Sequence, residues 1–230
     1  MAGRVVAVTG ASGALGSVVA RAAVEKGWRV ALIDHAHEPP PGFAEGEDVL
    51  IVRGVDLTNA EQAAVTLQAV VARFGGLDAL LNIAGGFRWE TVHGGATDTW
   101  DRLYRLNVLT ALHASRAAIP HLKASGSGRI VSVGANGAVK AAAGMGAYAA
   151  SKAGVHRLTE ALADELKADG ITVNAVLPSI IDTPANRADM PQADFEAWVK
   201  PEDLAAVMLF LASEEARAVT GALIPVTGRV

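Results

Sequence analysis

The chain has 230 residues, of which 51% are hydrophobic and 19% are charged, and its formal net charge is −4. This length suits one domain with a sizeable core, and the weak acidic balance offers no basic surface to nucleic acid or to an anionic membrane. The chain has no cysteine, which excludes disulfides and thiolate metal sites, and no apolar stretch long enough to span a bilayer, so we expect a soluble, cytoplasmic protein.

Short apolar runs alternate with longer, Ala-rich amphipathic stretches along the whole chain. Strands that alternate with helices form right-handed β-α-β units, so this order predicts an α/β fold over residues 1–230, a single domain with about seven parallel strands flanked by helices. The expected strands are Val5–Val8, Arg29–Ile33, Val49–Gly54, Ala79–Ile83, Arg129–Val133, Thr172–Val176 and Ala222–Val226. The expected helices are Leu15–Lys26, Ala60–Phe74, Thr97 to about Lys123, Tyr148–Ala168 and Pro201–Ala212.

A glycine-rich turn follows the first expected strand and opens the first expected helix. Gly10 permits a tight turn, Gly13 lets the backbone approach a diphosphate, and Gly16 lets the helix pack on the strand. Unpaired N–H groups at the start of the helix would then bind the phosphates. The alternative is a merely flexible turn, but the position between strand and helix favours a dinucleotide site in a doubly wound, Rossmann-type fold.

Asp34 ends the second expected strand, about 20 residues beyond the turn, where an acid binds the adenosine ribose. A carboxylate there accepts hydrogen bonds from the ribose hydroxyls and repels a 2′-phosphate. We therefore predict that the cofactor is NAD, with NADH preferred over NADPH. His35 and Arg53 would weaken this preference, and the alternative is a solvated acid at the end of a strand.

Two expected loops, 85–96 and 178–200, are longer than a simple connection requires. Both follow strands and therefore leave the carboxyl edge of the sheet, where open α/β folds bind ligands. Aromatic and amide side chains in these loops suit a flat heteroaromatic substrate, although Phe195 and Trp198 would alternatively anchor the loop to the core. The candidate substrate residues in the loops are Trp89, Asn186, Met190 and Trp198.

Tyr148 and Lys152 lie four residues apart in an expected helix, so both side chains project from one face. A phenol with a pKa near 10 exchanges protons poorly at neutral pH. A nearby ammonium, aided by the positive nicotinamide ring, stabilises the phenolate and lowers that pKa. We therefore predict that Tyr148 exchanges a proton with the substrate and that Lys152 assists it. The alternative is a chance pair on a helix.

A series of short motifs spans essentially the whole chain. The turn Thr9–Gly16 is matched to Thr-Gly-x-x-x-Gly-x-Gly, and Tyr148 and Lys152 to Tyr-x-x-x-Lys. The other motifs are Asp56-Leu57, Asn82-Ile83-Ala84-Gly85, Asn107 and Pro178-Ser179-Ile180-Ile181-Asp182-Thr183. In this order the motifs resemble those of the short-chain dehydrogenase/reductases.

The resemblance implies a role for each matched residue. The phosphates of NAD would lie against Ser12 and Leu15, and Lys152 would hold the nicotinamide ribose. Asn107 would order a water that relays protons to the lysine. The remaining implied contacts are those of Asp56 and Leu57 with the adenine, of Asn82, Ala84 and Gly85 with the ribose and the central cleft, and of Pro178, Ile181 and Thr183 with the nicotinamide carboxamide.

The chain departs from the family at Ala135, where a serine thirteen residues before the tyrosine usually donates to the substrate carbonyl. Ser132 would point to the opposite face of an extended strand, whereas Asn136 is an adjacent amide donor. Losing one such donor costs on the order of 10²–10³ in rate in acyl-transfer sites. The cost is smaller for an electron-poor acceptor. Ala135 and Asn136 are therefore candidate substrate residues, and activated acceptors are favoured.

The substrate loop and the surroundings of Tyr148 are also similar to dihydropteridine reductases, which prefer NADH and lack the serine. Asn107 and the tail from Phe210 to Ala222, in contrast, resemble the commoner bacterial reductases. The stretches similar to dihydropteridine reductases are Ala84-Gly85-Gly86, Gly144–Tyr148, Val176–Pro178, Ile181–Arg187, Met190–Phe195 and Trp198.

We expect an NADH-dependent oxidoreductase that transfers hydride to an activated C=N or C=O acceptor, pteridine-like or quinone-like. The alternatives are a conventional ketone, alcohol or 3-oxoacyl thioester oxidoreductase and a nucleotide sensor without turnover. The expected partners are a small-molecule substrate and further copies of the chain, in a homodimer or homotetramer that pairs through the two long helices. We expect no nucleic acid, membrane or metal partner. We interpret four histidines, which show no metal-ligand spacing with acids, as surface or packing residues: His93, His113, His121 and His156.

Overall fold

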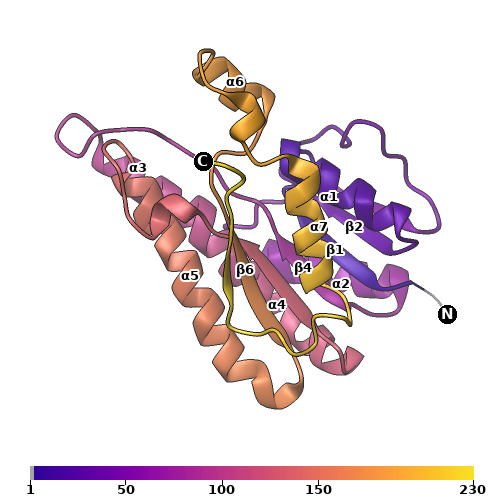
Figure 1. The fold of residues 1–230 in the computed structure, drawn as a ribbon. Coiled ribbons are helices and arrows are strands. Elements are labelled where there is room, and N and C mark those ends of the chain that lie inside the picture. The colour runs from indigo at the N-terminus through magenta and orange to yellow at the C-terminus, as the bar shows by residue number, and fades with distance from the viewer. Residues whose placement is uncertain (1–2) are drawn as a thin grey trace.

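The computed structural model describes residues 3–230 and contains one sheet of seven parallel strands in the order β3-β2-β1-β4-β5-β6-β7 (Figure 1). The order reverses between β1 and β4, which creates the switch point where doubly wound folds bind ligands. The predicted fold class is therefore confirmed. The strands are β1 Val5–Thr9, β2 Arg29–Ile33, β3 Val49–Val52, β4 Ala79–Asn82, β5 Arg129–Val133, β6 Thr172–Pro178 and β7 Leu223–Val226.

Helices cover both faces of the sheet and bury a separate core on each. Helices α1 (Ala14–Glu25) and α7 (Pro201–Leu211) pack on one face. Helices α2 (Ala60–Phe74), α4 (Thr110–Ser125) and α5 (Gly146–Leu166) pack on the other.

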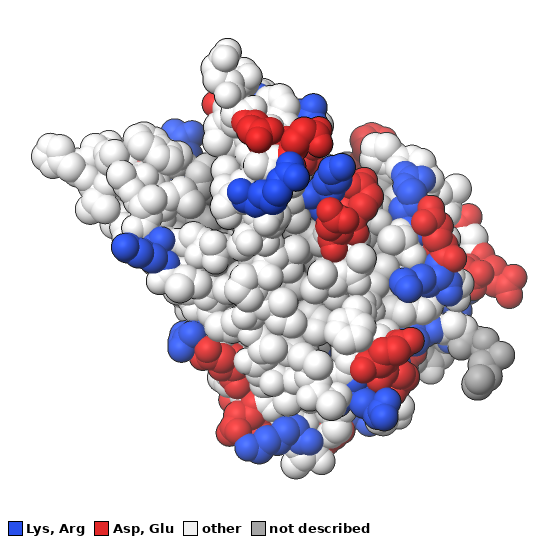
Figure 2. Space-filling view, in the orientation of Figure 1, with Lys and Arg blue, Asp and Glu red and all other residues white. Residues whose placement is uncertain are grey.

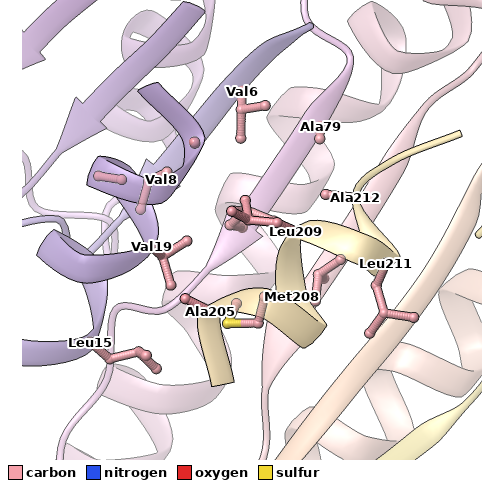
Figure 3. Packing of buried hydrophobic residues seen from close by; sticks show 14 of the residues in the cluster. Val6, Val8, Leu15, Val19, Ala79, Ala205, Met208, Leu209, Leu211 and Ala212 are labelled. Carbon is pink, nitrogen blue, oxygen red and sulfur yellow. The ribbon is translucent and has the colours of Figure 1, made fainter. Parts of the chain in front are cut away.

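The central strand β1 contributes to both cores because successive side chains of a strand point to opposite faces. Val6 and Val8 join the core under α1 and α7, while Val5 and Ala7 join the other. Figure 3 shows the first core from close by, with Val8 near Val19 and the α7 residues Ala205, Met208 and Leu209 at its centre. A strand buried on both faces reads as a continuous apolar run, which is why it was readily predicted.

Apart from helix ends that lie one or two residues from the predicted ones, the helical segments differ from prediction in two places. The expected helix from Thr97 to about Lys123 is divided into α3 (Thr97–Tyr104), a π-helical turn Arg105–Leu109 and α4. The expected loop 178–200 contains the short helix α6 (Pro184–Asp189) and a 3-10 turn, Phe195–Ala197. Helix α6 forms because the Thr183 hydroxyl accepts the N–H of Asn186 as an N-cap and Pro184 occupies the first turn.

Figure 1 shows α6 standing away from the sheet, above α1 and α7. Two further 3-10 turns, Asn136–Ala138 and Lys167–Asp169, flank α5. On the face drawn in Figure 2, Lys and Arg are interspersed with Asp and Glu around an uncharged central area, so this face carries no single-sign field. Within residues 3–230, no helix combines the length and the apolar character that crossing a membrane requires.

Candidate active site

A cavity of about 570 Å³ opens at the carboxyl edge of the sheet, at the switch point between β1 and β4. This volume lies within the range of roughly 300–1,000 Å³ that is usual for ligand sites. Most of the predicted cofactor residues line it together: Gly10, Gly13, Leu15, Gly16, Asp34, Asp56, Leu57, Ala84, Gly85, Tyr148, Lys152, Ile181 and Thr183. The predicted residues outside this lining are Ser12, Asn82, Asn107, Pro178 and the candidate substrate residues Trp89, Ala135, Asn136, Asn186, Met190 and Trp198.

The glycine turn has the tight geometry that was predicted for it. Gly10 has a φ of +67°, and a Cβ on it would lie 2.8 Å from the Cα of Ala84, which follows the end of the neighbouring strand β4. A Cβ on Gly16 would lie 2.0 Å from the Gly10 carbonyl oxygen, so the helix packs closely on the turn. The match to Thr-Gly-x-x-x-Gly-x-Gly is wrong in one position, because the middle glycine is Gly13 and Ala14 follows it.

Asp34 lines the cavity at the end of β2, with its carboxylate fixed by two backbone donors. Oδ2 accepts the N–H of Ser12 at 2.8 Å and Oδ1 accepts the N–H of Ala36 at 2.9 Å. The Ser12 hydroxyl is buried and has no hydrogen-bond partner within residues 3–230. Ser12 therefore contacts Asp34 through its backbone, and its predicted contact with the phosphates stays a prediction.

Tyr148 and Lys152 face the cavity from one side of α5, one helical turn apart. Lys152 is only 5% exposed, and its Nζ donates to the Val133 carbonyl oxygen at 2.7 Å. Burial lowers the pKa of Lys152 to about 8 and raises the pKa of Tyr148 to about 12. The expected lowering of the Tyr148 pKa is therefore wrong for the protein by itself, because the loss of solvent around the phenolate dominates.

Phe87 lines the cavity, although no sequence motif predicts it as a site residue. Its ring meets the ring of Tyr148 edge to face, with 4.9 Å between the centroids, and it is 52% exposed. Trp89 lies beyond it, against the backbone of Gly144. The signal that points to Phe87 is its place two residues after Gly85, on the loop that leaves the carboxyl end of β4.

Asn107 lies in the π-helical turn and joins two walls of the site. Its Oδ1 accepts the N–H of Gly86 at 2.8 Å, and its Nδ2 donates to the Gly86 carbonyl at 3.1 Å and to the Ser151 hydroxyl at 2.9 Å. A Cβ on Gly85 would lie 2.5 Å from the Asn107 Oδ1, so glycine is needed there. Single π-helical turns often occur at functional sites. The role of Asn107 in a proton relay stays a prediction.

The segment after β5 is held by α5. Ala135 is 3% exposed, and its N–H donates to the Nε2 of His156 at 3.3 Å. Ser132 is buried, and its hydroxyl accepts from the Asn82 amide at 3.4 Å, which places both side chains in the interior. The interpretation of His156 as a surface or packing residue is incomplete, because the imidazole is a buried hydrogen-bond acceptor.

The substrate loop uses its polar and aromatic side chains internally. The Asn186 amide donates to the Ile181 carbonyl at 2.8 Å, and the guanidinium of Arg187 pairs with Asp182 and lies 4.6 Å from the centroid of Phe195. Trp198 is buried and packs on Phe195. Trp198 therefore fits the alternative interpretation, in which it anchors the loop together with Phe195, better than the prediction that it contacts the substrate.

Comparisons with known proteins cover almost the entire chain. A family model described as short chain dehydrogenase matches residues 4–194. The chain is 32% identical over 247 residues to the 2,5-dichloro-2,5-cyclohexadiene-1,4-diol dehydrogenase of Sphingobium indicum, covering 99% of this chain and 96% of the relative. It is 32% identical over 238 residues to the 3-oxoacyl-(acyl-carrier-protein) reductase of Vibrio cholerae, covering 98% and 96%. A solved short-chain type dehydrogenase/reductase from Mycobacterium ulcerans superposes with a TM-score of 0.88 at 26% identity, covering 98% and 89%.

Proposed function

The chain belongs to the short-chain dehydrogenase family and is an oxidoreductase, and we propose that it transfers hydride from NADH to an activated C=N or C=O acceptor. The observation that carries this proposal is the cavity that joins Asp34 at one end to Tyr148 and Lys152 at the other. The family uses NAD(P). The proposals that NADH is the preferred cofactor and that the acceptor is activated rest on particular residues of this chain.

The cavity fits a dinucleotide. The close approach of Gly10 to Ala84 and of Gly16 to Gly10 leaves the turn bare of side chains at the start of α1, where N–H groups would bind the diphosphate. Asp34 would accept hydrogen bonds from the adenosine ribose, and its charge would repel a 2′-phosphate. The glycine turn supports a dinucleotide of either kind, and Asp34 supports NADH as the preferred cofactor.

The protonation states suit the reductive direction. With a pKa of about 12, Tyr148 is a neutral phenol at neutral pH and has a proton to donate, but it is a weak acid unless a cation stabilises its phenolate. Lys152, with a pKa of about 8, is mostly protonated at neutral pH and would stabilise the phenolate that the donation leaves. The cofactor, when bound, would supply the hydride, and Tyr148 would supply the proton to the nitrogen or oxygen of the reduced double bond.

The choice of an activated acceptor follows from Ala135. Its methyl group offers no hydroxyl donor where the family usually has serine, so an electron-poor pteridine-like or quinone-like ring would need the least help. The half-exposed ring of Phe87 beside Tyr148 supports a flat substrate, because an aromatic face at the cavity wall can stack on it. The similarity of the substrate loop to dihydropteridine reductases supports the same choice.

A conventional ketone, alcohol or 3-oxoacyl thioester oxidoreductase is the second candidate. It is favoured by the relatives, one of which is named for a cyclohexadiene diol and another for a 3-oxoacyl thioester of a carrier protein. In this case a group other than residue 135 would have to donate to the substrate oxygen.

A steady-state panel tests the two candidates. NADH oxidation is measured with quinonoid dihydropterin and with benzoquinones, and compared with acetoacetyl thioesters and, using NAD⁺, with secondary alcohols. We expect kcat/KM to be at least about tenfold higher for the quinonoid acceptors. Tyr148→Phe serves as the control that separates enzymatic from spontaneous reduction, and a preference for thioesters or alcohols would contradict the proposal.

We also propose that copies of the chain pair through α3 and α5. Trp100 and Tyr104 of α3 are exposed aromatic residues, and covering them would remove apolar surface from water. Sedimentation equilibrium distinguishes a monomer from a dimer or tetramer, and Tyr104→Arg should shift the equilibrium toward the monomer.

A further inference from the structure

Helix α5 presents three side chains toward the end of β5 and the cavity, at positions 148, 152 and 156. Residues four apart lie above one another on a helix, so these three form one column. Lys152 and His156 both reach the backbone at the end of β5: Lys152 Nζ donates to the Val133 carbonyl at 2.7 Å, and His156 Nε2 accepts the Ala135 N–H at 3.3 Å. Both side chains are buried, with 5% and 3% exposure.

Gly134 lies between the two attachment points and makes the contact with His156 possible. A Cβ on Gly134 would lie 2.5 Å from the His156 Nε2, so any larger residue would push the imidazole away. The N–H of Gly134 donates to the Val176 carbonyl of β6 at 2.9 Å. The end of β5 is therefore fixed by β6 on one side and by Lys152 and His156 on the other.

We propose that His156 is a positioning residue for Lys152: its unprotonated Nε2 holds the Ala135 N–H and so fixes the Val133 carbonyl that orients the ammonium. Protonation would place an N–H of the imidazolium against the N–H of Ala135. Two donors cannot share this bond, so the segment 133–136 would separate from α5 and Lys152 would lose its fixed partner. The consequence for catalysis rests on the proposed role of Lys152, whereas the contact itself does not.

The charges around His156 favour the neutral state. Burial, and then the charges of Arg157 and Lys152, lower the pKa of His156. Arg157 itself pairs with Glu160 at 2.8 Å on the same helix. Of the strands packed against α5, β6 contains no titratable residue and β5 contains only Arg129, at its opposite end. The contact is therefore complete at neutral pH and is lost as the pH falls below the ordinary histidine value of about 6.5.

The test follows the amide resonance of Ala135 by nuclear magnetic resonance between pH 8 and pH 4.5. In the wild-type protein we expect one inflection below pH 6.5, coincident with titration of the His156 ring. His156→Gln keeps a neutral acceptor at every pH, so the inflection should vanish. His121→Gln is the matched control and should leave the inflection in place, because His121 lies on α4 beside Val5 and Asp78, at the amino edge of the sheet and away from Ala135.

A second measurement connects the contact to Lys152. The dissociation constant of NADH is compared for wild type, His156→Gln and His156→Leu at each pH. We expect His156→Leu to bind NADH about tenfold more weakly at every pH, because one buried hydrogen bond is lost. His156→Gln should bind NADH within about threefold of the wild type at neutral pH and should not bind it more weakly in acid. The proposal is overturned if Ala135 shows no inflection in the wild type, if His156→Gln keeps it, or if His156→Leu binds NADH as the wild type does. Absence of turnover with every acceptor would count against the proposed function and leave the resonance test decisive.

Discussion

A buried cation lies at each end of strand β5, and the two cations differ in their hydrogen-bond and ion-pair partners. Arg129, 2% exposed, begins the strand at the amino edge of the sheet, and Lys152, 5% exposed, holds its last carbonyl at the carboxyl edge. Arg129 donates to the carbonyls of Ser213 at 3.1 Å and Gly128 at 2.8 Å, and pairs with Glu214 at 3.4 Å. Within residues 3–230, the ion pairs include none that involves Lys152.

The difference appears in the pKa values. Burial lowers the pKa of Arg129, but the charge of Glu214 opposes the shift. Burial alone lowers the pKa of Lys152 to about 8. A buried charge whose hydrogen-bond and ion-pair partners are all present supports the fold. A buried charge without a counter-ion lowers the stability of the fold, and such groups are found mainly at functional sites. We therefore expect the amino edge to be the structural end of the strand and, under the proposed function, the carboxyl edge to be the reactive one.

The largest expected effect is at the reactive end. Tyr148→Phe removes the only phenol that lines the described cavity, and we expect kcat to fall by about 10³-fold, within the range usual for loss of a general acid. The dissociation constant of NADH, measured by fluorescence, should change by less than about threefold. Tyr104→Phe changes the only other tyrosine of the chain and should leave kcat unaltered. Equal turnover by Tyr148→Phe and the wild type would remove the basis of the proposed mechanism.

At the structural end the expected effect is on stability. Arg129→Met leaves the carbonyls of Ser213 and Gly128 without their cationic donor and removes one of the two arginines that pair with Glu214, the other being Arg4, so we expect the free energy of unfolding to fall by about 2–3 kcal/mol. The kcat of the folded fraction should not change. Lys123→Met, which removes an ion pair with Asp169 at the surface, is the control and should cost less than about 1 kcal/mol. Similar losses for both variants in urea denaturation would contradict the contrast.

Lys152→Met should have the opposite sign of effect on stability. A folded-state pKa of about 8 against the ordinary 10.5 means that the protonated lysine disfavours the folded state. Part of the gain is offset because the Val133 carbonyl loses its donor, so we expect an increase of about 1–2 kcal/mol in the free energy of unfolding at pH 7.

This gain depends on pH in a defined direction. It is complete below pH 8 and disappears as the pH rises toward 10.5, where the wild-type lysine is neutral in both states. Denaturation at pH 7 and pH 10 measures it, and Lys167→Met, at an exposed position, is the control. A loss of stability at pH 7 would mean that the buried ammonium supports the fold as Arg129 does.

The sequence predicted those parts of the molecule that depend on local periodicity and on backbone geometry. The buried strands, the column of Tyr148 and Lys152 and the tight turn at Gly10 all follow from spacing along the chain. The sign of the Tyr148 pKa shift could not be predicted in this way, because it depends on how much solvent the assembled walls exclude. The π-helical turn at Asn107 could not be predicted for a similar reason. The Asn107 side chain accepts a hydrogen bond from Gly86, 21 residues away in the sequence, and such a contact exists only in the folded chain.

The substrate loop shows the same limit. Its composition suited a flat ligand, but Trp198 packs on Phe195 and Arg187 pairs with Asp182, so the loop uses these side chains for its own structure. Phe87, which does line the cavity, lacked a motif to distinguish it. Spacing identifies side chains on one element reliably, whereas a pocket wall made from several loops requires their relative positions.

Asp34 combines features of both ends, and its replacement has the smallest expected effect. Its carboxylate faces the cavity, yet both oxygens already accept backbone N–H groups, from Ser12 and Ala36. Asp34→Ala should therefore weaken NADH binding by about tenfold and cost about 1 kcal/mol of stability, because a ribose contact and two hydrogen bonds are lost. Asp34→Asn keeps the shape and removes the charge, so NADPH should gain affinity relative to NADH without the full loss of stability. If the ratio of the NADH and NADPH dissociation constants is unchanged in both variants, Asp34 is a structural charge like Arg129. The residues proposed to act on cofactor and substrate would then be those of α5, Tyr148 and Lys152.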